Sequence, residues 1–411
     1  MGKLSSLLKK WTESSLVLRI FIGLVIGAAL GLLCPKWTGI GLLGQVFVSA
    51  LKAIAPVLVF VLVASSIARA KGGLGPRFRT VITLYLLSTF VAAVIAVVGS
   101  FLFPVTIRLT GEAEGGAPGG LADVFSTLLS NMVMNPVQAL AQANYIGILF
   151  WAIVIGFALK LKAGEGTVRA AGDLADVVSM VVKWIIQFAP FGILGLVFSS
   201  VSESGLEIFV DYGKLILLLV SCMLFTSMLV NPFIAWVHLR KNPYPLYWRC
   251  LKDSGLNAFF TRSSAANIPI NMELCKNLGL DEEFYSVSIP LGSTINMNGA
   301  AVTITVLSLA VAHTVGIEVS FLSALFLSLV ATLGACGASG VAGGSLLLVP
   351  MACSFFGIGN DIAMQAVAVG FIIGVVQDSV ETMLNSSGDA FFTAVAEFHD
   401  RKKKGASVSQ S

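Results

Sequence analysis

Long apolar stretches separated by short charged segments set the pattern of the first half of the chain. Six of them reach or approach the roughly 20 residues that cross a bilayer as a helix. They lie near residues 16–34, 42–68, 80–104, 145–161, 174–202 and 213–237. The pattern predicts membrane-spanning helices joined by short loops. No convincing cleavage site follows the first stretch, so it is predicted to stay as a helix.

Composition excludes the soluble and fibrous classes. Of 411 residues, 56% are hydrophobic and only 12% are charged, whereas a soluble domain has roughly 25% charged residues. The length accommodates about eight to ten spans and leaves no room for a separate soluble domain. The net charge of +4 comes from Lys and Arg in short loops, so no nucleic-acid surface is expected.

Lys and Arg gather in alternate loops. They precede the first stretch and follow the second, fourth and sixth, while the loops between carry mainly acidic residues. Because cytoplasmic loops are enriched in Lys and Arg, the N-terminus, these loops and the basic tail 401–411 are predicted to be cytoplasmic. The segment 111–120, GEAEGGAPGG, is then an external loop.

From residue 253 onward, small and polar residues interrupt the apolar stretches. A small-residue tip at 263–267 precedes a helix broken at 296–300, and a second tip at 338–344 precedes a helix broken at 385–390. Paired interrupted segments are typical of inverted-repeat transporters with a site at the membrane midplane. The alternative is that these small residues only permit tight helix packing.

Three carboxylates in the last apolar run, 362–397, favour a polar site over simple packing. Asp378, Glu381 and Asp389 lie there, yet no Lys or Arg occurs between residues 276 and 401. Their spacings of 3 and 11 place them near one helical face. Burying such charges in a membrane is costly, so they must be protonated, paired or offset by a cation.

One basic residue is available to pair with them. Arg262 at the first tip could pair with Asp378 or Glu381, and a purely structural salt bridge is the alternative reading of one acid. Arg262 cannot neutralise all three, so the remaining charge requires Na⁺, H⁺ or a ligand ammonium.

The polar residues around the helix breaks complete a site for a zwitterion. Thr294, Asn296, Asn298, Asn385 and Asp389 supply the oxygen atoms that hard cations prefer. Helix N-termini after the breaks can bind a carboxylate. By contrast, the six scattered cysteines are interpreted as packing residues, and three histidines far apart in sequence give a zinc or haem site little support.

Three motifs then carry a resemblance to a known family. SSAANIP at 263–269, NMNGA at 296–300 and D-x-x-E-T-M-x-N-x-x-G-D at 378–389 occur in this order. The chain resembles the dicarboxylate/amino acid:cation symporters over nearly its whole length, and is most similar to their bacterial sodium/serine–threonine branch.

The resemblance implies the all-α glutamate-transporter-homologue fold, with eight transmembrane helices, two re-entrant hairpins and inverted repeats. It implies an elevator-type homotrimer in the bacterial inner membrane. The scaffold would be spans 1–2 (residues 1–79) and 4–5 (111–212), and the transport domain span 3 (80–110) and residues 213–400.

It also implies the residues of the site. Asp378 would bind the substrate ammonium and Asn385 its carboxylate, and the full set of substrate contacts would be Ser263, Ser264, Met297, Val341, Gly343, Asp378, Glu381, Thr382 and Asn385. The gating hairpins would use Arg262, Pro269, Gly340 and Ala342, the last replacing the usual proline. Sodium ligands would be Gly292, Asn296, Asn385 and Asp389 in one site, and Thr294, Ala335, Cys336 and Ala338 in another.

Two departures from the family pattern predict the specificity and the ion count. Glu381 replaces the arginine of acidic-substrate members, whose guanidinium recognises a side-chain carboxylate, so small neutral amino acids such as serine and threonine are expected. Asn298 replaces the aspartate of a third sodium site that would include Tyr85, Ser88 and Thr89. Loss of an anionic ligand should weaken that site.

Three rival interpretations remain open at this point. Ser339 lies in a GxSG pattern of intramembrane proteases, with His313 as the available base. In a chain with 41 glycines, a match of this length easily arises by chance. Coupling to protons in place of sodium is the second, and a channel is the third. The sequence favours an amino-acid symporter that needs Na⁺ and no organic cofactor, contacts membrane lipid and is not an enzyme.

Overall fold

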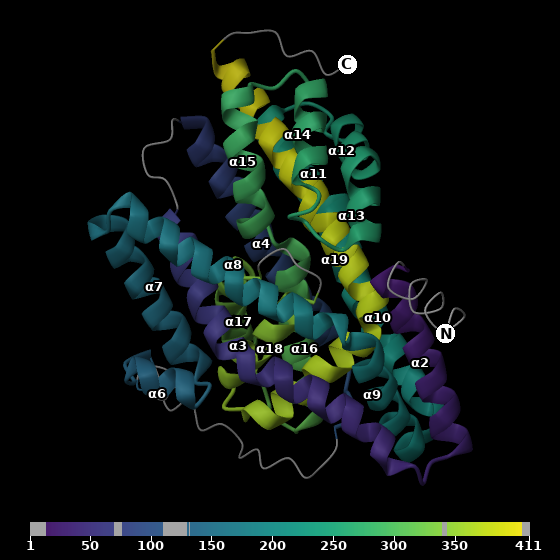
Figure 1. Cartoon of the computed structure of the whole chain (residues 1–411). Coiled ribbons are helices and arrows are strands. Elements are labelled where there is room, and N and C mark those ends of the chain that lie inside the picture. The colour runs from purple at the N-terminus through teal and green to yellow at the C-terminus, as the bar shows by residue number, and fades with distance from the viewer. Residues whose placement is uncertain (1–13, 70–75, 110–129, 131, 339–342, 405–411) are drawn as a thin grey trace, which may run out of the picture.

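The structure, a computed structural model, describes residues 14–69, 76–109, 130, 132–338 and 343–404. This part of the chain is helical and contains no strand (Figure 1). The helices are α2 (Leu16–Leu33), α3 (Gly41–Arg69), α4 (Pro76–Leu102), α6 (Pro136–Ala141), α7 (Tyr145–Lys162), α8 (Glu165–Gln187), α9 (Ala189–Ser204), α10 (Ile208–Phe225), α11 (Asn231–Leu239), α12 (Tyr244–Cys250), α13 (Leu256–Thr261), α14 (Ile268–Asn277), α15 (Glu282–Ile295), α16 (Asn298–Thr314), α17 (Phe321–Ala335), α18 (Val349–Ser354) and α19 (Asn360–Lys403).

Six helical segments of the described chain are long and apolar enough to cross a membrane, or seven if one bent pair counts as a span. The bent pair corrects a prediction. The run 174–202 was expected as one stretch, but α8 and α9 meet at an angle of 53°. Pro190 in the first turn of α9 explains the bend, because its missing N–H and its ring prevent α8 from continuing.

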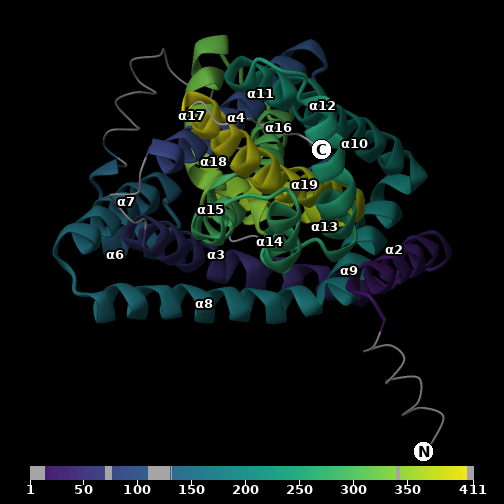
Figure 2. The ribbon, with the colours of Figure 1, turned by 90° about the horizontal axis from the view of Figure 1, so that it is seen from above.

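The helices form two layers. Along one side, α2 packs on α9, and α3 packs on α7, α8 and α9. Figure 2 shows α8 lying alongside α3, with α9 and α2 at the right-hand end of this pair, beside a bundle that contains α10 to α19. α4 belongs to that bundle through contacts with α16, α17 and α19. Most residues of α19 are buried, and this helix passes through the centre of that bundle.

The predicted break in the first of the two helices is confirmed. α15 ends at Ile295, Asn296 and Met297 have non-helical backbone angles, and α16 begins at Asn298. The segment predicted as the first hairpin forms the helices α12 to α13 and α14, with residues 262–267 between α13 and α14. The second consists of α17 and α18 with a preceding 3₁₀ turn, Ser345–Leu348.

The predicted break at 385–390 is wrong, because α19 runs through it without interruption. The hydroxyl of Ser387 donates to the Met383 carbonyl at 2.6 Å, so this polar side chain is satisfied within the helix. Gly388 permits a close approach: a Cβ there would lie 2.7 Å from Nδ2 of Asn296. The small polar residues therefore serve packing against the broken helix and do not unwind α19.

Basic segments from three parts of the chain meet at one end of the molecule. Arg401 donates to the Gly279 carbonyl and Lys402 to the Leu239 carbonyl. Arg77 pairs with Asp281 at 2.6 Å, and this hydrogen bond holds the pKa of the Asp281 carboxyl below its ordinary value. The loops after the second and sixth predicted spans thus lie on the same side as the basic C-terminal end of α19.

Candidate functional site

The three predicted carboxylates of α19 lie inside the protein. The exposed fractions of Asp378, Glu381 and Asp389 are 2%, 5% and 0%. A fourth acid, Glu397, is equally buried, but it forms an ion pair with Arg401 and accepts from the backbone N–H of Asp281. Glu397 lies at the end of the apolar run and its partner is four residues away, so it needs no visiting cation.

Asp378 lies where the two hairpins meet. Arg262 donates from Nε to its Oδ2 at 2.6 Å, and the Gly343 N–H donates to Oδ1 at 3.2 Å. Arg262 follows α13 in the left-handed conformation, with φ 52°, which turns the chain into the tip. Of the two acids that Arg262 could have joined, the structure pairs it with Asp378. The hydroxyl of Thr382 donates to the Asp378 carbonyl, one turn earlier on α19, at 2.8 Å.

Glu381 has no basic partner among the described residues and is held by neutral donors. Its Oε2 accepts from the hydroxyl of Thr303 at 2.7 Å, the hydroxyl of Ser345 at 2.9 Å and the amide of Gln377 at 2.6 Å. Sequence reasoning missed these three residues. The i, i+4 spacing to Gln377 could have been noticed, but Thr303 and Ser345 lie on other segments and left no sequence signal.

Asn385 connects α19 to the start of α16. Its side-chain oxygen accepts from the Gly299 N–H at 2.8 Å, and its Nδ2 lies 3.4 Å from the sulfur of Met297. The first turn of α16 has N–H groups without helical partners. Asn385 caps one of them, so it lies at a helix end that was predicted to bind a carboxylate.

Asp389 is the acid that most clearly lacks a partner. Its Oδ1 accepts from Nδ2 of Asn296 at 2.9 Å, and the same nitrogen donates to the Asn385 carbonyl at 3.0 Å. Its Oδ2 is buried without a hydrogen-bond partner among the described residues. A Cβ on Gly292 would lie 2.9 Å from Oδ1, so the α15 backbone passes directly beside the carboxylate. The predicted sodium ligands Gly292 and Asn296 therefore lie against Asp389, and the Asn385 carbonyl shares the Asn296 amide with it.

The group predicted around Asn298 is only partly assembled. Ser88 and Thr89 of α4 donate to its side-chain oxygen at 3.1 and 3.0 Å. Its amide reaches the Asn231 oxygen at 3.5 Å, a contact that the sequence did not indicate. Tyr85 points away from this group: its hydroxyl bonds to the Asp389 carbonyl at 3.1 Å and to Thr393 at 2.8 Å. Neutral side chains satisfy one another here.

The remaining residues predicted as sodium ligands are Thr294, Ala335, Cys336 and Ala338. The thiol of Cys336 donates to the Ile295 carbonyl at 3.8 Å, which joins the end of α17 to the last residue of α15. The hydroxyl of Thr294 donates to the Leu291 carbonyl at 2.7 Å. Ala335 and Ala338 are buried.

The residues predicted at the first hairpin tip are described by the structure, whereas most of those predicted at the second tip are not. Ser264 is buried, and Ser263 accepts from the Ala266 N–H within the tip. Pro269 opens α14. Asn267, which was not predicted, ties the tip to α19 through the hydroxyl of Ser386 at 2.7 Å. The predicted residues Ser339, Gly340, Val341 and Ala342 lie outside the described residues.

All six cysteines are free, and four of the six, which were interpreted as packing residues, are buried. Two of the three histidines are distant in the sequence but neighbours in the structure. The rings of His238 and His399 lie 5.4 Å apart, while His313 is at the end of α16. The described residues contain no cluster of three or more potential metal-ligating His, Cys, Asp or Glu residues.

The protease interpretation pairs His313 with Ser339, and Ser339 lies outside the described residues. The described end of the second tip contacts Ile295, beside the N-terminus of α16. His313 belongs to the opposite end, 15 residues beyond Asn298, which corresponds to about 22 Å along a helix.

Comparison with known proteins agrees with the resemblance drawn from the motifs. The description "Sodium:dicarboxylate symporter family" matches residues 16–398. A Bifidobacterium adolescentis protein named "Serine/threonine transporter SstT" is 56% identical over 410 residues, which cover 98% of this chain and 95% of that protein. Proteins of the same name from Streptococcus thermophilus (58% identical; 96% and 98% covered) and Streptococcus agalactiae (57% identical; 95% and 97% covered) are also similar. The chain is a membrane transporter and not an enzyme, and it belongs to the sodium:dicarboxylate symporter family.

Proposed function

We propose that this chain is a sodium-coupled symporter that imports small neutral amino acids, above all serine and threonine, by alternating access. The observation that carries the proposal is the carboxylate of Asp389, which is fully buried with one oxygen unpartnered among the described residues. An ionised carboxylate in such a position requires a compensating cation. Oxygen-rich neighbours and the absence of a basic partner among the described residues suit Na⁺.

Asp378 is proposed to bind the ammonium group of the substrate. In this structure Arg262 occupies that carboxylate. When the substrate ammonium replaces the guanidinium, the charge at Asp378 stays balanced, because one cation exchanges for another. Arg262 belongs to a hairpin tip, so movement of that tip would couple release of the carboxylate to opening of the site.

Glu381 is proposed to exclude acidic substrates. An aspartate or glutamate side chain would meet a second carboxylate in a buried environment, where like charges repel strongly. A serine or threonine hydroxyl brings no such penalty and can donate to Glu381 or exchange hydrogen bonds with Thr382. The names of the similar proteins, serine/threonine transporters, support this substrate class.

Asn385 offers a physical link between sodium and substrate. Its backbone carbonyl accepts from the same Asn296 amide that binds Asp389, while its side chain caps α16 at Gly299. Sodium bound at Asp389 would order Asn296 and the helix break, and so position the helix end that receives the substrate carboxylate. Binding at two such connected sites is reciprocal, so each ligand strengthens the other.

The arrangement of layers supports an elevator mechanism. All described site residues belong to α4 and to segments from α11 onward, and none belongs to α2, α3, α7, α8 or α9. We propose that these five helices form the scaffold of a homotrimer and that the bundle around α19 moves. With the basic loops placed inside, both termini would be cytoplasmic in a bacterial inner membrane.

Uptake of radiolabelled serine into proteoliposomes tests the function. An inward Na⁺ gradient should drive accumulation, whereas a H⁺ gradient alone or no gradient should not. Excess threonine should compete with serine and aspartate should not. Accumulation driven by the H⁺ gradient without Na⁺ would overturn sodium coupling in favour of protons.

A further inference from the structure

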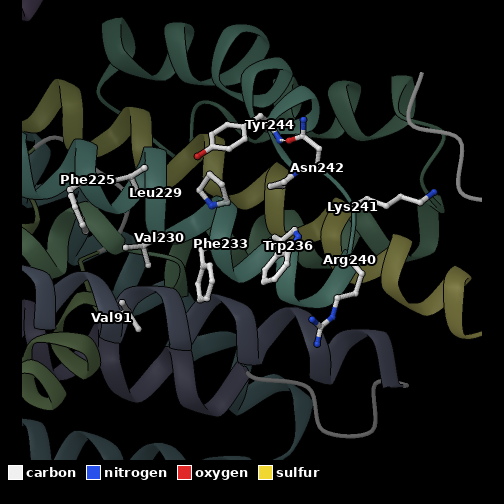
Figure 3. Close-up of a pocket in the computed structure, with 12 residues that line it drawn as sticks. Val91, Phe225, Leu229, Val230, Phe233, Trp236, Arg240, Lys241, Asn242 and Tyr244 are labelled. Atoms are coloured by element: carbon white, nitrogen blue, oxygen red, sulfur yellow. Dashed lines mark hydrogen bonds between the residues drawn. The ribbon is translucent and has the colours of Figure 1, made fainter.

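A large apolar groove lies outside the site, between α4 and the helices α10 and α11. Its volume is about 900 Å³. Phe225, Leu229, Phe233 and Trp236 follow one another along one wall at helical spacing, and Val91 of α4 faces them (Figure 3). These four wall residues are between 44% and 61% exposed. Exposed apolar surface of this extent marks a site of interaction with protein or with membrane lipid.

The shape of this wall comes from an irregular helix. Between α10 and α11 the chain makes a π-helical turn, Thr226–Val230, and Pro232 follows it. Because Pro232 has no N–H, the carbonyl of Met228 loses its helical partner. The hydroxyl of Tyr244 donates to that carbonyl at 3.0 Å, and so fixes an aromatic ring at the groove. The groove is thus a structured part of the fold.

One end of the groove is cationic. Arg240 and Lys241 line it, and the described lining contains no carboxylate. The guanidinium of Arg240 lies 5.5 Å from the centre of the Trp236 ring, a cation–π contact that holds the charge beside the apolar wall. Arg240 forms no ion pair with a described residue.

The negative end of α11 is satisfied without the guanidinium of Arg240. The carbonyls of His238 and Leu239 accept from His399 and Lys402 of α19, so other cationic or polar groups already satisfy the helix terminus. The guanidinium of Arg240 therefore remains available to a ligand at the groove.

We propose that this groove binds one phospholipid with an anionic headgroup, its phosphate at Arg240 and Lys241 and an acyl chain along Phe233, Leu229 and Phe225. Basic pockets between transmembrane helices are suited to anionic headgroups, and Trp and Tyr side chains belong at the membrane interface. A free phosphate would leave the apolar wall without a partner. The lipid would contact α4 at Val91, within one turn of Ser88 and Thr89, on the helix that reaches Asn298.

Native mass spectrometry of the purified full chain, titrated with phosphatidylglycerol or phosphatidylcholine, tests the proposal. We expect one tightly bound phosphatidylglycerol and weaker phosphatidylcholine. The R240Q/K241Q variant should weaken phosphatidylglycerol binding on the order of thirtyfold, the scale of two basic residues at an anionic membrane surface. The variant K160Q/K162Q removes two exposed cations at the end of α7 and should bind like the parent.

A second variant tests the apolar wall independently. Leu229→Trp changes an exposed residue and fills the groove, so it should lower binding of both lipids while the melting temperature stays unchanged. Unchanged phosphatidylglycerol binding in R240Q/K241Q, an equal loss in K160Q/K162Q, or displacement of the lipid by equimolar glycerol 3-phosphate would each overturn the proposal. None of these measurements depends on transport, so they are independent of the proposed coupling to sodium.

Discussion

Replacement of Asp389 by asparagine is the sharpest test of the ion site. The change keeps the shape of the side chain and an oxygen that accepts from Asn296, but removes the negative charge. Removing one partner of a buried charge pair costs about 3–5 kcal/mol. Since about 1.4 kcal/mol corresponds to a tenfold change, the Na⁺ concentration for half-maximal binding should rise at least about a hundredfold.

In the absence of Na⁺, the same substitution should not lower the melting temperature. Without Na⁺, the parent carries a buried carboxylate oxygen with no partner among the described residues. Asparagine removes that uncompensated charge, so the sodium-free variant should melt at the same temperature as the parent or higher. A merely structural role for Asp389 predicts a lower melting temperature instead.

Thermal melting and serine uptake measured over a Na⁺ titration, with ionic strength held constant by choline chloride, read out both effects. Asp361→Asn is a matched control on the same helix, because Asp361 is 88% exposed and pairs with Lys52 at the surface. Its sodium dependence should match that of the parent. If Asp389→Asn requires no more than about threefold more Na⁺, the carboxylate is not an ion ligand.

Three further substitutions probe neighbouring parts of the site. Asp378→Asn should abolish serine binding at every Na⁺ concentration, as measured by calorimetry; normal serine transport would refute its role with the ammonium. Glu381→Arg should lower serine uptake and improve competition by aspartate, since a guanidinium would face a side-chain carboxylate. Gly292→Ala should increase the Na⁺ requirement on the order of tenfold or more because its Cβ would lie 2.9 Å from Asp389. Gly213→Ala meets nothing within 4 Å and should leave sodium binding intact.

The amino-acid sequence was sufficient to identify the class of molecule and the chemical problem at its centre. Apolar stretches of bilayer length and the low charge content depend only on the composition and the order of residues, so they can be identified without a structure. The same is true of the acids on the last helix. Three carboxylates without nearby basic residues are a local property of one segment, and their burial follows from the apolar residues around them.

The positions at which helices break were harder to predict from the sequence. Ser386, Ser387 and Gly388 predicted a broken helix, yet α19 is continuous because contacts from the first hairpin and from Asn296 satisfy or accommodate these residues. A similar motif at Asn296 and Met297 does break its helix. Local composition is alike in the two cases, and the surroundings of each segment produce the difference.

The partners of the acids depended entirely on folding. Arg262 is 116 residues from Asp378, and Thr303 is 78 residues from Glu381. Periodicity along one helix states which side chains share a face, but carries no information about the segment packed against that face. The order of residues therefore shows that the charges of the three acids need compensation. Contacts between distant segments decide how each acid is treated: an arginine pairs with the first, neutral donors bind the second, and one oxygen of the third stays unpaired among the described residues.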